Sequence, residues 1–156
     1  MDIGCGDGFF VLPAARLVGE EGKVYGLDID REVIDRLKEE AAREGLRNLD
    51  LKVGEAEAAL LCEACADIIF FGSVLHDFKD PAMVLMNAKR MLKHNGHLVN
   101  LDWKKEHIGL TDKIFGPPLW KRFSAEEAGR LIEEAGFRIE TVKEAGPHHY
   151  MITAKP

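Results

Sequence analysis

Short apolar runs alternate along this chain with stretches whose apolar residues recur at helical spacing. That alternation is typical of a parallel sheet whose strands are joined by crossover helices. Strands are predicted over residues 23–28, 49–53, 67–71 and 97–103, after a remnant at 1–3. The run over 67–71 is apolar on both faces, as expected of a central parallel strand. The remnant is shorter than the usual five or so residues, so the first strand is either truncated or stunted.

Capping and breaking residues predict where the helices begin and end. A first helix runs from about Phe9 to Val18, with Pro13 in its first turn, where a backbone N–H has no partner anyway. Asp30 caps a second helix that Gly45 ends. Asp80-Pro81 begins a third helix, which we expect to end at Asn95-Gly96. Its predicted buried face comprises Val84, Leu85, Ala88, Met91 and Leu92.

The C-terminal third begins with a segment of no clear period, 104–123, which we interpret as an inserted loop near the substrate side. Ser124 and Glu127 have the capping-box spacing and open a helix ending at Gly136. Two strands, 137–143 and 150–154, follow; their short connection predicts antiparallel pairing. The predicted fold is therefore a single α/β domain over 1–156, with a doubly wound, mostly parallel sheet, helices on both faces and an antiparallel C-terminal hairpin.

Composition narrows the class of protein. The chain has 156 residues, of which 46% are hydrophobic and 31% charged, which excludes a disordered or fibrous chain. No apolar run is long enough to span a bilayer, and no secretory signal is visible. The net charge of −6 makes nucleic acid a poor expected partner. Three cysteines, an odd number, predict reduced thiols in a cytoplasmic protein.

A glycine-rich turn follows the first strand remnant. Gly4, Gly6 and Gly8 allow a sharp turn and close approach of a ligand to the backbone, because a Cβ would collide. Asp28, 20 residues after Gly8, comes at the end of the next strand, where an acidic side chain can accept hydrogen bonds from both ribose hydroxyls. The combination predicts a ligand that contains a nucleoside.

The spacing of the glycines discriminates between such ligands. Dinucleotide enzymes have G-x-G-x-x-G, which would place a third glycine at position 9, where this chain has Phe9. No Gly-Lys-Ser/Thr sequence of a phosphate-binding loop occurs either. A nicotinamide-dependent oxidoreductase is therefore the less favoured alternative.

Five segments, in order along nearly the whole chain, resemble the motifs of class I S-adenosylmethionine-dependent methyltransferases. They are 2–8 (DIGCGDG), 24–30 (VYGLDID), 53–57 (VGEAE), 67–78 (DIIFFGSVLHDF) and 90–98 (RMLKHNGHL). The resemblance implies the Rossmann-like methyltransferase fold, S-adenosyl-L-methionine as cofactor and S-adenosyl-L-homocysteine as product.

The resemblance also implies a role for each matching residue. The glycine turn would pass under the methionine portion of the cofactor, and the next motifs would hold its ribose, its adenine and the region near its sulfur. The implied contacts are Gly4, Cys5, Gly6 and Gly8 in the turn, Asp2 bracing it, Asp28 on the ribose, Ile29 against adenine, Glu55 and the Ala56 N–H at the adenine edge, and Gly72 and Ser73 near the sulfur. Glu55 stands where aspartate is commoner.

Two further signals are ambiguous. Cys62 and Cys65 form an isolated C-x-x-C; a zinc site needs four ligands, so packed thiols are predicted and no metal site is expected. A metalloid-binding role and a redox role are the less favoured alternatives for this pair. His76 follows the strand beside which an acceptor would approach, and it is a candidate general base or an ordinary loop histidine. Trp103 lies at the end of the next strand, where it either forms one wall of a substrate site or only covers the core.

The predicted function is methyl transfer to an unidentified acceptor, most simply a small molecule, by in-line displacement at the sulfonium methyl. Such chemistry depends mainly on proximity and alignment. The alternative is a cofactor-binding regulatory module without turnover, favoured by the lack of the N-terminal segment that precedes the first strand in typical members. A homodimer whose partner covers the open site is a further hypothesis. No membrane partner is expected.

Overall fold

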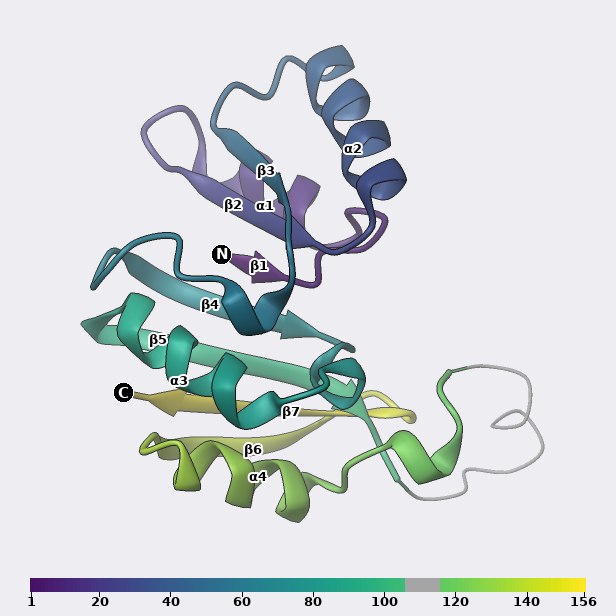
Figure 1. Cartoon of the computed structure of the whole chain (residues 1–156), viewed down its shortest axis with the longest axis vertical. Helices are drawn as coiled ribbons and strands as arrows, with labels where there is room; N and C mark the ends of the chain where they lie inside the picture. Colours follow the sequence, from purple (N-terminus) through teal and green to yellow (C-terminus); the bar gives the residue numbers. More distant parts are fainter. Residues whose placement is uncertain (106–115) are drawn as a thin grey trace.

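The computed structural model describes residues 1–105 and 116–156 (Figure 1). The strands are β1 (Asp2–Ile3), β2 (Val24–Asp28), β3 (Leu49–Val53), β4 (Ala66–Gly72), β5 (Leu92–Trp103), β6 (Arg138–Ala145) and β7 (His149–Lys155). The helices are α1 (Val11–Val18), α2 (Arg31–Arg43), α3 (Pro81–Met91) and α4 (Ala125–Glu134). Three short 3-10 turns used below are η1 (Ala56–Ala58), η2 (Leu75–Asp77) and η4 (Leu119–Lys121).

All seven strands form one sheet in the order β3-β2-β1-β4-β5-β7-β6. β1 to β5 pair in parallel, whereas β7 runs antiparallel to both β5 and β6. The predicted doubly wound sheet with an antiparallel C-terminal hairpin is confirmed, including a first strand of two residues. The chain winds outward in opposite directions from β1 and β4, which makes this the switch point where open α/β sheets bind ligands.

Two apolar clusters cover the sheet. Val24 and Leu27 are three residues apart on β2, so they point to opposite faces, and they belong to different clusters. One cluster joins α1 and α2 to β2 and β3, and the other joins α3 and α4 to β4, β5 and β7. Figure 1 shows these two helix pairs at opposite ends of the sheet.

The predicted end of the third helix is wrong. α3 stops at Met91, and Leu92 already has extended backbone angles and pairs with Ala66 as the first residue of β5. Asn95 and Gly96 lie inside that strand, where the register with β4 shifts between Ala66 and Ile68. A Cβ on Gly96 would lie 2.8 Å from the Ala66 carbonyl oxygen. Gly96 therefore permits close strand packing at a bulge and does not end a helix.

β4 is a central parallel strand, as predicted, but it is fully buried on one face only. Ile69 and Phe71 are fully buried, but Ile68, on the other face of β4, is 53% exposed. The packed helices α3 and α4 lie on the Ile69 side. Val142 on β6 is similarly half exposed.

The capping signals were predicted correctly. Asp30 accepts from the backbone N–H groups of Glu32 and Val33, and Asp80 accepts from Met83. Pro13 lies in the first turn of α1. The insert at 104–123 contains the short turn η4, and its residues 106–115 lie outside the described part of the chain. Among the described residues, no helix is long and apolar enough to cross a membrane.

We expect Ser124→Ala to lower the free energy of unfolding by about 1 kcal/mol. Both hydrogen bonds of the capping box are present: the Ser124 hydroxyl accepts from Glu127 N, and the Glu127 carboxylate accepts from Ser124 N. Urea unfolding would measure the loss. Arg130→Ala, on the exposed side of the same helix, is the matched control, and an equal loss in both variants would contradict the assignment.

Candidate functional site

A hollow of about 130 Å³ opens at the carboxyl ends of the strands around the switch point. Its walls come from the segments that follow four neighbouring strands. These are Gly4 after β1, Asp28 and Ile29 after β2, residues 54–57 after β3, and Val74, Asp77, Phe78 and Lys79 after β4. Larger open hollows lie at the amino ends of β2 and β3, among exposed side chains such as Arg47. Ligands of this fold class bind at the carboxyl edge, so the smaller hollow is the candidate site.

The glycine turn has a backbone that other residues adopt with strain. Gly4, Gly6 and Gly8 all have positive φ angles, of 76°, 48° and 85°. A Cβ on Gly4 would lie 2.4 Å from Val74 Cγ2, whereas a Cβ on Gly6 would meet nothing within 4 Å. Gly4 is therefore required by packing. Gly6 has open space at the position of a Cβ, although it is not among the residues that line the hollow; such space is what close approach of a ligand to the backbone needs.

Asp28 holds this turn in place. One carboxylate oxygen accepts from Gly6 N at 2.9 Å, and the other accepts from Asp30 N at 3.0 Å. A carboxylate has about four acceptor positions, so Asp28 keeps capacity for ribose hydroxyls while it braces the turn. The predicted position of Asp28 in the site is thus matched by the geometry.

Asp2 does not brace the turn by hydrogen bonding, contrary to the expectation. Its side chain is 5% exposed, and neither carboxylate oxygen has a hydrogen-bond partner. Burial, with a smaller contribution from the Asp28 charge, raises the pKa of Asp2 to about 7. The residue that braces the turn is Asp28, because β2 places its carboxylate beside Gly6.

The adenine-edge candidates all line the hollow. Ile29 is 60% exposed beside Asp28, and Ala56 lies in η1. The Glu55 carboxylate accepts from Lys79 Nζ at 3.1 Å, so it is paired across the hollow with the loop before α3. Glu57 accepts from the backbone N–H groups of Lys79 and Asp80, which ties the two loops together. The sequence analysis assigned no role to Glu57, although Glu57 lies in the 53–57 motif, and none to Lys79, which lies in no motif.

Gly72 and Ser73 end β4 beside the hollow but do not contribute to its lining. Gly72 packs under aromatic rings: a Cβ there would lie 2.6 Å from Phe70 and 2.9 Å from Phe10. Ser73 has a positive φ of 58°, and its N–H donates to the Leu101 carbonyl at 2.7 Å. Their predicted contacts near the cofactor sulfur stay predictions.

The imidazole of His76 is buried next to a carboxylate. His76 Nδ1 lies 2.7 Å from Asp102 Oδ1, and the two side chains are 3% and 1% exposed. η2 carries His76 at the end of β4, and Asp102 lies near the end of the neighbouring β5. Asp77, on the other side of the ring, faces the hollow. The sequence carried no signal of the contact between Asp102 and His76.

Trp103 lies under a cluster of side chains and does not form an open wall. The Arg122 guanidinium lies 5.3 Å from the Trp103 ring, and the His149 ring lies at 4.2 Å. Burial lowers the pKa of His149. Trp103 therefore covers this end of the β5–β7 pair.

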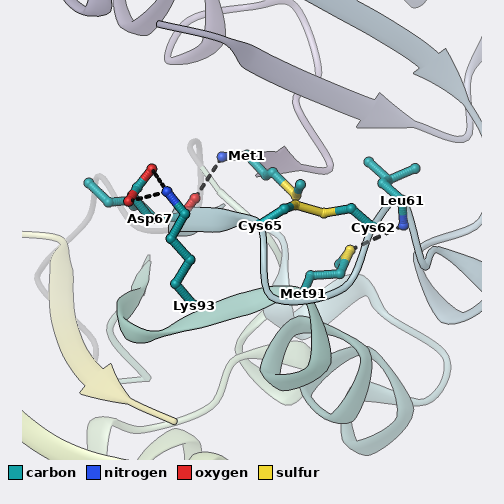
Figure 2. The surroundings of a disulfide bond; sticks show 8 residues. Met1, Leu61, Cys62, Cys65, Asp67, Met91 and Lys93 are labelled. Carbon is teal, nitrogen blue, oxygen red and sulfur yellow. Dashed lines mark hydrogen bonds and ion pairs between the residues drawn. A yellow bond between two sulfur atoms is a disulfide. The ribbon is translucent and has the colours of Figure 1, made fainter.

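Cys62 and Cys65 are disulfide-bonded, so the prediction of reduced thiols is wrong for this pair (Figure 2). Their Cα atoms are 6.1 Å apart, within the usual range for a disulfide. Sequence spacing could not decide between thiols and a disulfide, because the loop conformation sets the Cα separation. The loop is held against α3, since Leu61 N donates to Met91 Sδ.

The disulfide is remote from the hollow because Cys65 immediately precedes β4, whereas the hollow lies beyond the other end of that strand. Cys5 is a buried free cysteine in the glycine turn, and burial raises the pKa of its thiol to about 12. No cluster of three or more potential metal-ligating side chains occurs within residues 1–105 and 116–156.

Comparisons of both sequence and structure with known proteins find methyltransferases. A family described as a methyltransferase domain matches residues 1–136. A crystal structure of a SAM dependent methyltransferase from Aquifex aeolicus superposes with a TM-score of 0.89 at 32% identity, covering 98% of this chain and 79% of that one.

Two curated relatives are an aklanonic acid methyltransferase from Streptomyces sp. (strain C5) and a demethylmenaquinone methyltransferase from Lactococcus lactis. The first is 34% identical over 63% of this chain and 44% of the relative. The second is 28% identical over 94% of this chain and 68% of the relative. The chain thus spans under half the length of the first of them.

The buried Asp2 carboxyl predicts a pH-dependent stability. Its pKa is raised in the folded protein, so the folded state binds more protons than the unfolded state between about pH 4 and pH 7. Stability is then highest below this window and falls as the pH rises through it, by about 2 kcal/mol between pH 5 and 7. Asp2→Asn should remove most of this slope, as measured by urea unfolding at several pH values. Glu20→Gln, which changes an exposed carboxylate, should keep the slope; a slope unchanged in Asp2→Asn would contradict the assignment.

Proposed function

The chain belongs to the methyltransferase domain family, and we propose that it transfers the methyl group of S-adenosyl-L-methionine to a small-molecule acceptor. The observation that carries the proposal is the pairing of Gly6 and Asp28. The turn keeps open space over Gly6, and the same carboxylate that braces it has acceptor positions left for a ribose.

The residues around the hollow fit an adenosyl cofactor. Ile29 offers an exposed apolar side chain for a purine ring, beside the acidic Asp28. Asp28, Glu55, Glu57 and Asp77 all line the hollow, and Lys79 is the cation among the lining residues. An acidic lining suits a ligand that carries a sulfonium and an ammonium group, and it would repel the pyrophosphate of a dinucleotide.

In this proposal the protein acts mainly by alignment. The bound cofactor supplies an electrophilic methyl group that needs little further activation. The glycine turn fixes the position of the cofactor, and the loops after β3 and β4, joined through Glu57 and Lys79, enclose it. Holding two reactants in line can supply about 7–11 kcal/mol of the barrier, so an acid–base group is required only where the acceptor must lose a proton.

A small-molecule acceptor is favoured by the relatives, which are methyltransferases named for aklanonic acid and demethylmenaquinone. A metalloid acceptor held by the cysteine pair is disfavoured, because Cys62 and Cys65 precede β4 at the edge of the sheet away from the hollow. The rival cofactor-binding module without turnover would bind the same cofactor and differ only in the absence of methyl transfer.

We expect S-adenosyl-L-homocysteine to raise the melting temperature, and NAD to leave it unchanged. At about 100 times the dissociation constant the ligand adds roughly 2.7 kcal/mol, or about 5–10 °C for a domain of this size. Differential scanning fluorimetry measures the shift. Stabilisation by NAD alone would contradict the proposal and favour a dinucleotide enzyme.

The Gly6→Ala variant tests whether the ligand binds against the backbone at Gly6, apart from any effect of the substitution on stability. Ala at either Gly6 or Gly45 has a positive φ with nothing within 4 Å of the Cβ, so both substitutions should cost about 1 kcal/mol of stability. Gly6→Ala should weaken S-adenosyl-L-homocysteine binding by roughly tenfold or more, since the added Cβ occupies open space at the turn that the proposed cofactor approaches. Gly45→Ala, at the left-handed cap that ends α2, is the matched control and should bind normally in calorimetry. Equal affinities in the two variants would show that the ligand binds elsewhere.

A further inference from the structure

The loop that carries Cys62 and Cys65 connects the candidate site to β4. It follows η1, whose Ala56 and Glu57 line the hollow, and it ends where β4 begins at Ala66. Residues 59–65 form neither strand nor helix, so no ladder of backbone hydrogen bonds holds them. The conformation of this loop therefore depends on a few contacts, and the disulfide is one of them (Figure 2).

Backbone hydrogen bonds hold the cysteine end of the loop against the last turn of α3. Leu61 N donates to Met91 Sδ at 3.3 Å. The N–H groups of Ala64 and Cys65 donate to the carbonyl oxygens of Arg90 and Met91, each at 2.9 Å. Two of these three donors lie within the ring that the disulfide closes, so their positions depend on the conformation of that ring.

Ala64, between the two cysteines, has an unfavourable backbone conformation. Its φ is 46°, and Ser73 is the only other non-glycine residue with a positive φ among residues 1–105 and 116–156. A residue with a Cβ keeps this conformation only where its surroundings hold it. Breaking the disulfide removes one of the constraints on Ala64, and relaxation of Ala64 would move the two N–H groups that bind the end of α3. Reduction therefore frees the loop to leave α3.

A permanent cross-link explains this disulfide poorly. The stabilisation expected from a disulfide grows with the length of the loop that it closes, and this one closes only residues 62–65. C-x-x-C is instead the spacing of dithiol–disulfide exchange centres. A reductant can reach the ring, because Glu63 and Ala64 between the cysteines are exposed. The pair is thus accessible and has the spacing that exchange requires.

We propose that Cys62 and Cys65 form a reversible thiol–disulfide site, which reacts with dithiol reductants and controls how tightly the hollow binds the cofactor. The second part rests on the function proposed above. In the oxidised form the loop stays on α3, and Ala56 and Glu57 keep the positions that line the hollow. In the reduced form the segment between η1 and β4 opens more often, so a smaller fraction of molecules has a competent site and the apparent Kd rises.

The exchange step balances with a dithiol as the reductant. A thiolate of the dithiol attacks one sulfur of the pair, so the Cys62–Cys65 bond breaks and a mixed disulfide forms. The second thiol of the reductant then displaces the cysteine from the mixed disulfide. The reductant loses two electrons and two protons and ends as a disulfide, while Cys62 and Cys65 gain them and end as thiols. Oxidation by a disulfide follows the same steps in reverse.

Alkylation of the native protein tests the exchange without any cofactor. Wild type is equilibrated in mixtures of reduced and oxidised dithiothreitol, treated with iodoacetamide and weighed by mass spectrometry, with circular dichroism to show that it stays folded. We expect Cys62 and Cys65 to be alkylated together in reducing mixtures and to be protected again in oxidising ones. Cys5 should stay unmodified throughout, because it is buried and burial raises the pKa of its thiol. A pair that is reduced only when the protein unfolds, or that does not re-form its disulfide, would overturn the proposal.

Calorimetry with S-adenosyl-L-homocysteine measures the coupling between the two sites. We expect reduced wild type to bind it about fivefold or more weakly than oxidised wild type. Coupling is reciprocal, so a saturating concentration of S-adenosyl-L-homocysteine should raise the ratio of reduced to oxidised dithiothreitol at half-reduction by the same factor. The double variant Cys62→Ser/Cys65→Ser is the matched control; it should bind like reduced wild type and should not respond to dithiothreitol.

The two parts of the proposal fail in different ways. Failure of oxidised wild type to bind S-adenosyl-L-homocysteine would overturn the proposed function and, with it, the control of the site, while alkylation alone decides the exchange step. Equal affinities in oxidised and reduced wild type would overturn the control and leave the proposed function intact. Reduced wild type carries no substitution, so this comparison holds even if the double variant does not fold.

Discussion

The carboxylate of Asp28 is the contact on which the candidate site depends. It accepts hydrogen bonds from Gly6 N and Asp30 N, so a single side chain connects the glycine turn after β1 with the start of α2 after β2. The turn is also held by the N–H groups of Gly4 and Cys5, which both donate to the Leu27 carbonyl. Without these contacts, a turn with three positive φ angles would have little to keep it in one conformation. The shape of the candidate site is therefore built into the end of the sheet.

The same edge of the sheet carries two kinds of acidic group with different surroundings. Asp28 and Asp77 are open to the hollow and paired with donors, while Asp2 and Asp102 are buried behind them. Asp102 has partners for Oδ1 in His76 and Trp103, whereas neither oxygen of Asp2 has a hydrogen-bond partner. Burial without a partner favours the neutral acid, and this is why the pKa of Asp2 is raised. A layer of buried acids thus lies beneath the layer that faces the ligand.

The loops after β3 and β4, which line part of the hollow, are tied to one another by hydrogen bonds. Glu57 after β3 accepts from two backbone N–H groups before α3, and Asn87 of α3 donates to the Glu57 carbonyl. At the far end of the same connection, the Cys62–Cys65 disulfide loop is held by Met91 (Figure 2). α3 therefore supports the whole segment between β3 and β4, from the ligand edge to the opposite edge of the sheet.

The sequence by itself determined the strand and helix order and the caps at Asp30, Asp80 and Ser124. It also predicted that Gly6 and Asp28 belong together, and the two residues are hydrogen-bonded. These are local signals: hydrophobic period, capping chemistry and glycine spacing act within a few residues, or across one strand–helix unit. Tertiary structure alone decided that Leu92 begins a strand, because its pairing with Ala66 overrides the helical pattern. It also decided the Cys62–Cys65 bond, the burial of Asp2 and the contact of His76 with Asp102. The burial of Asp2 and the contact of His76 with Asp102 depend on how the strands pair, and the disulfide depends on the conformation of its loop. Neither can be inferred from the spacing of residues along the chain.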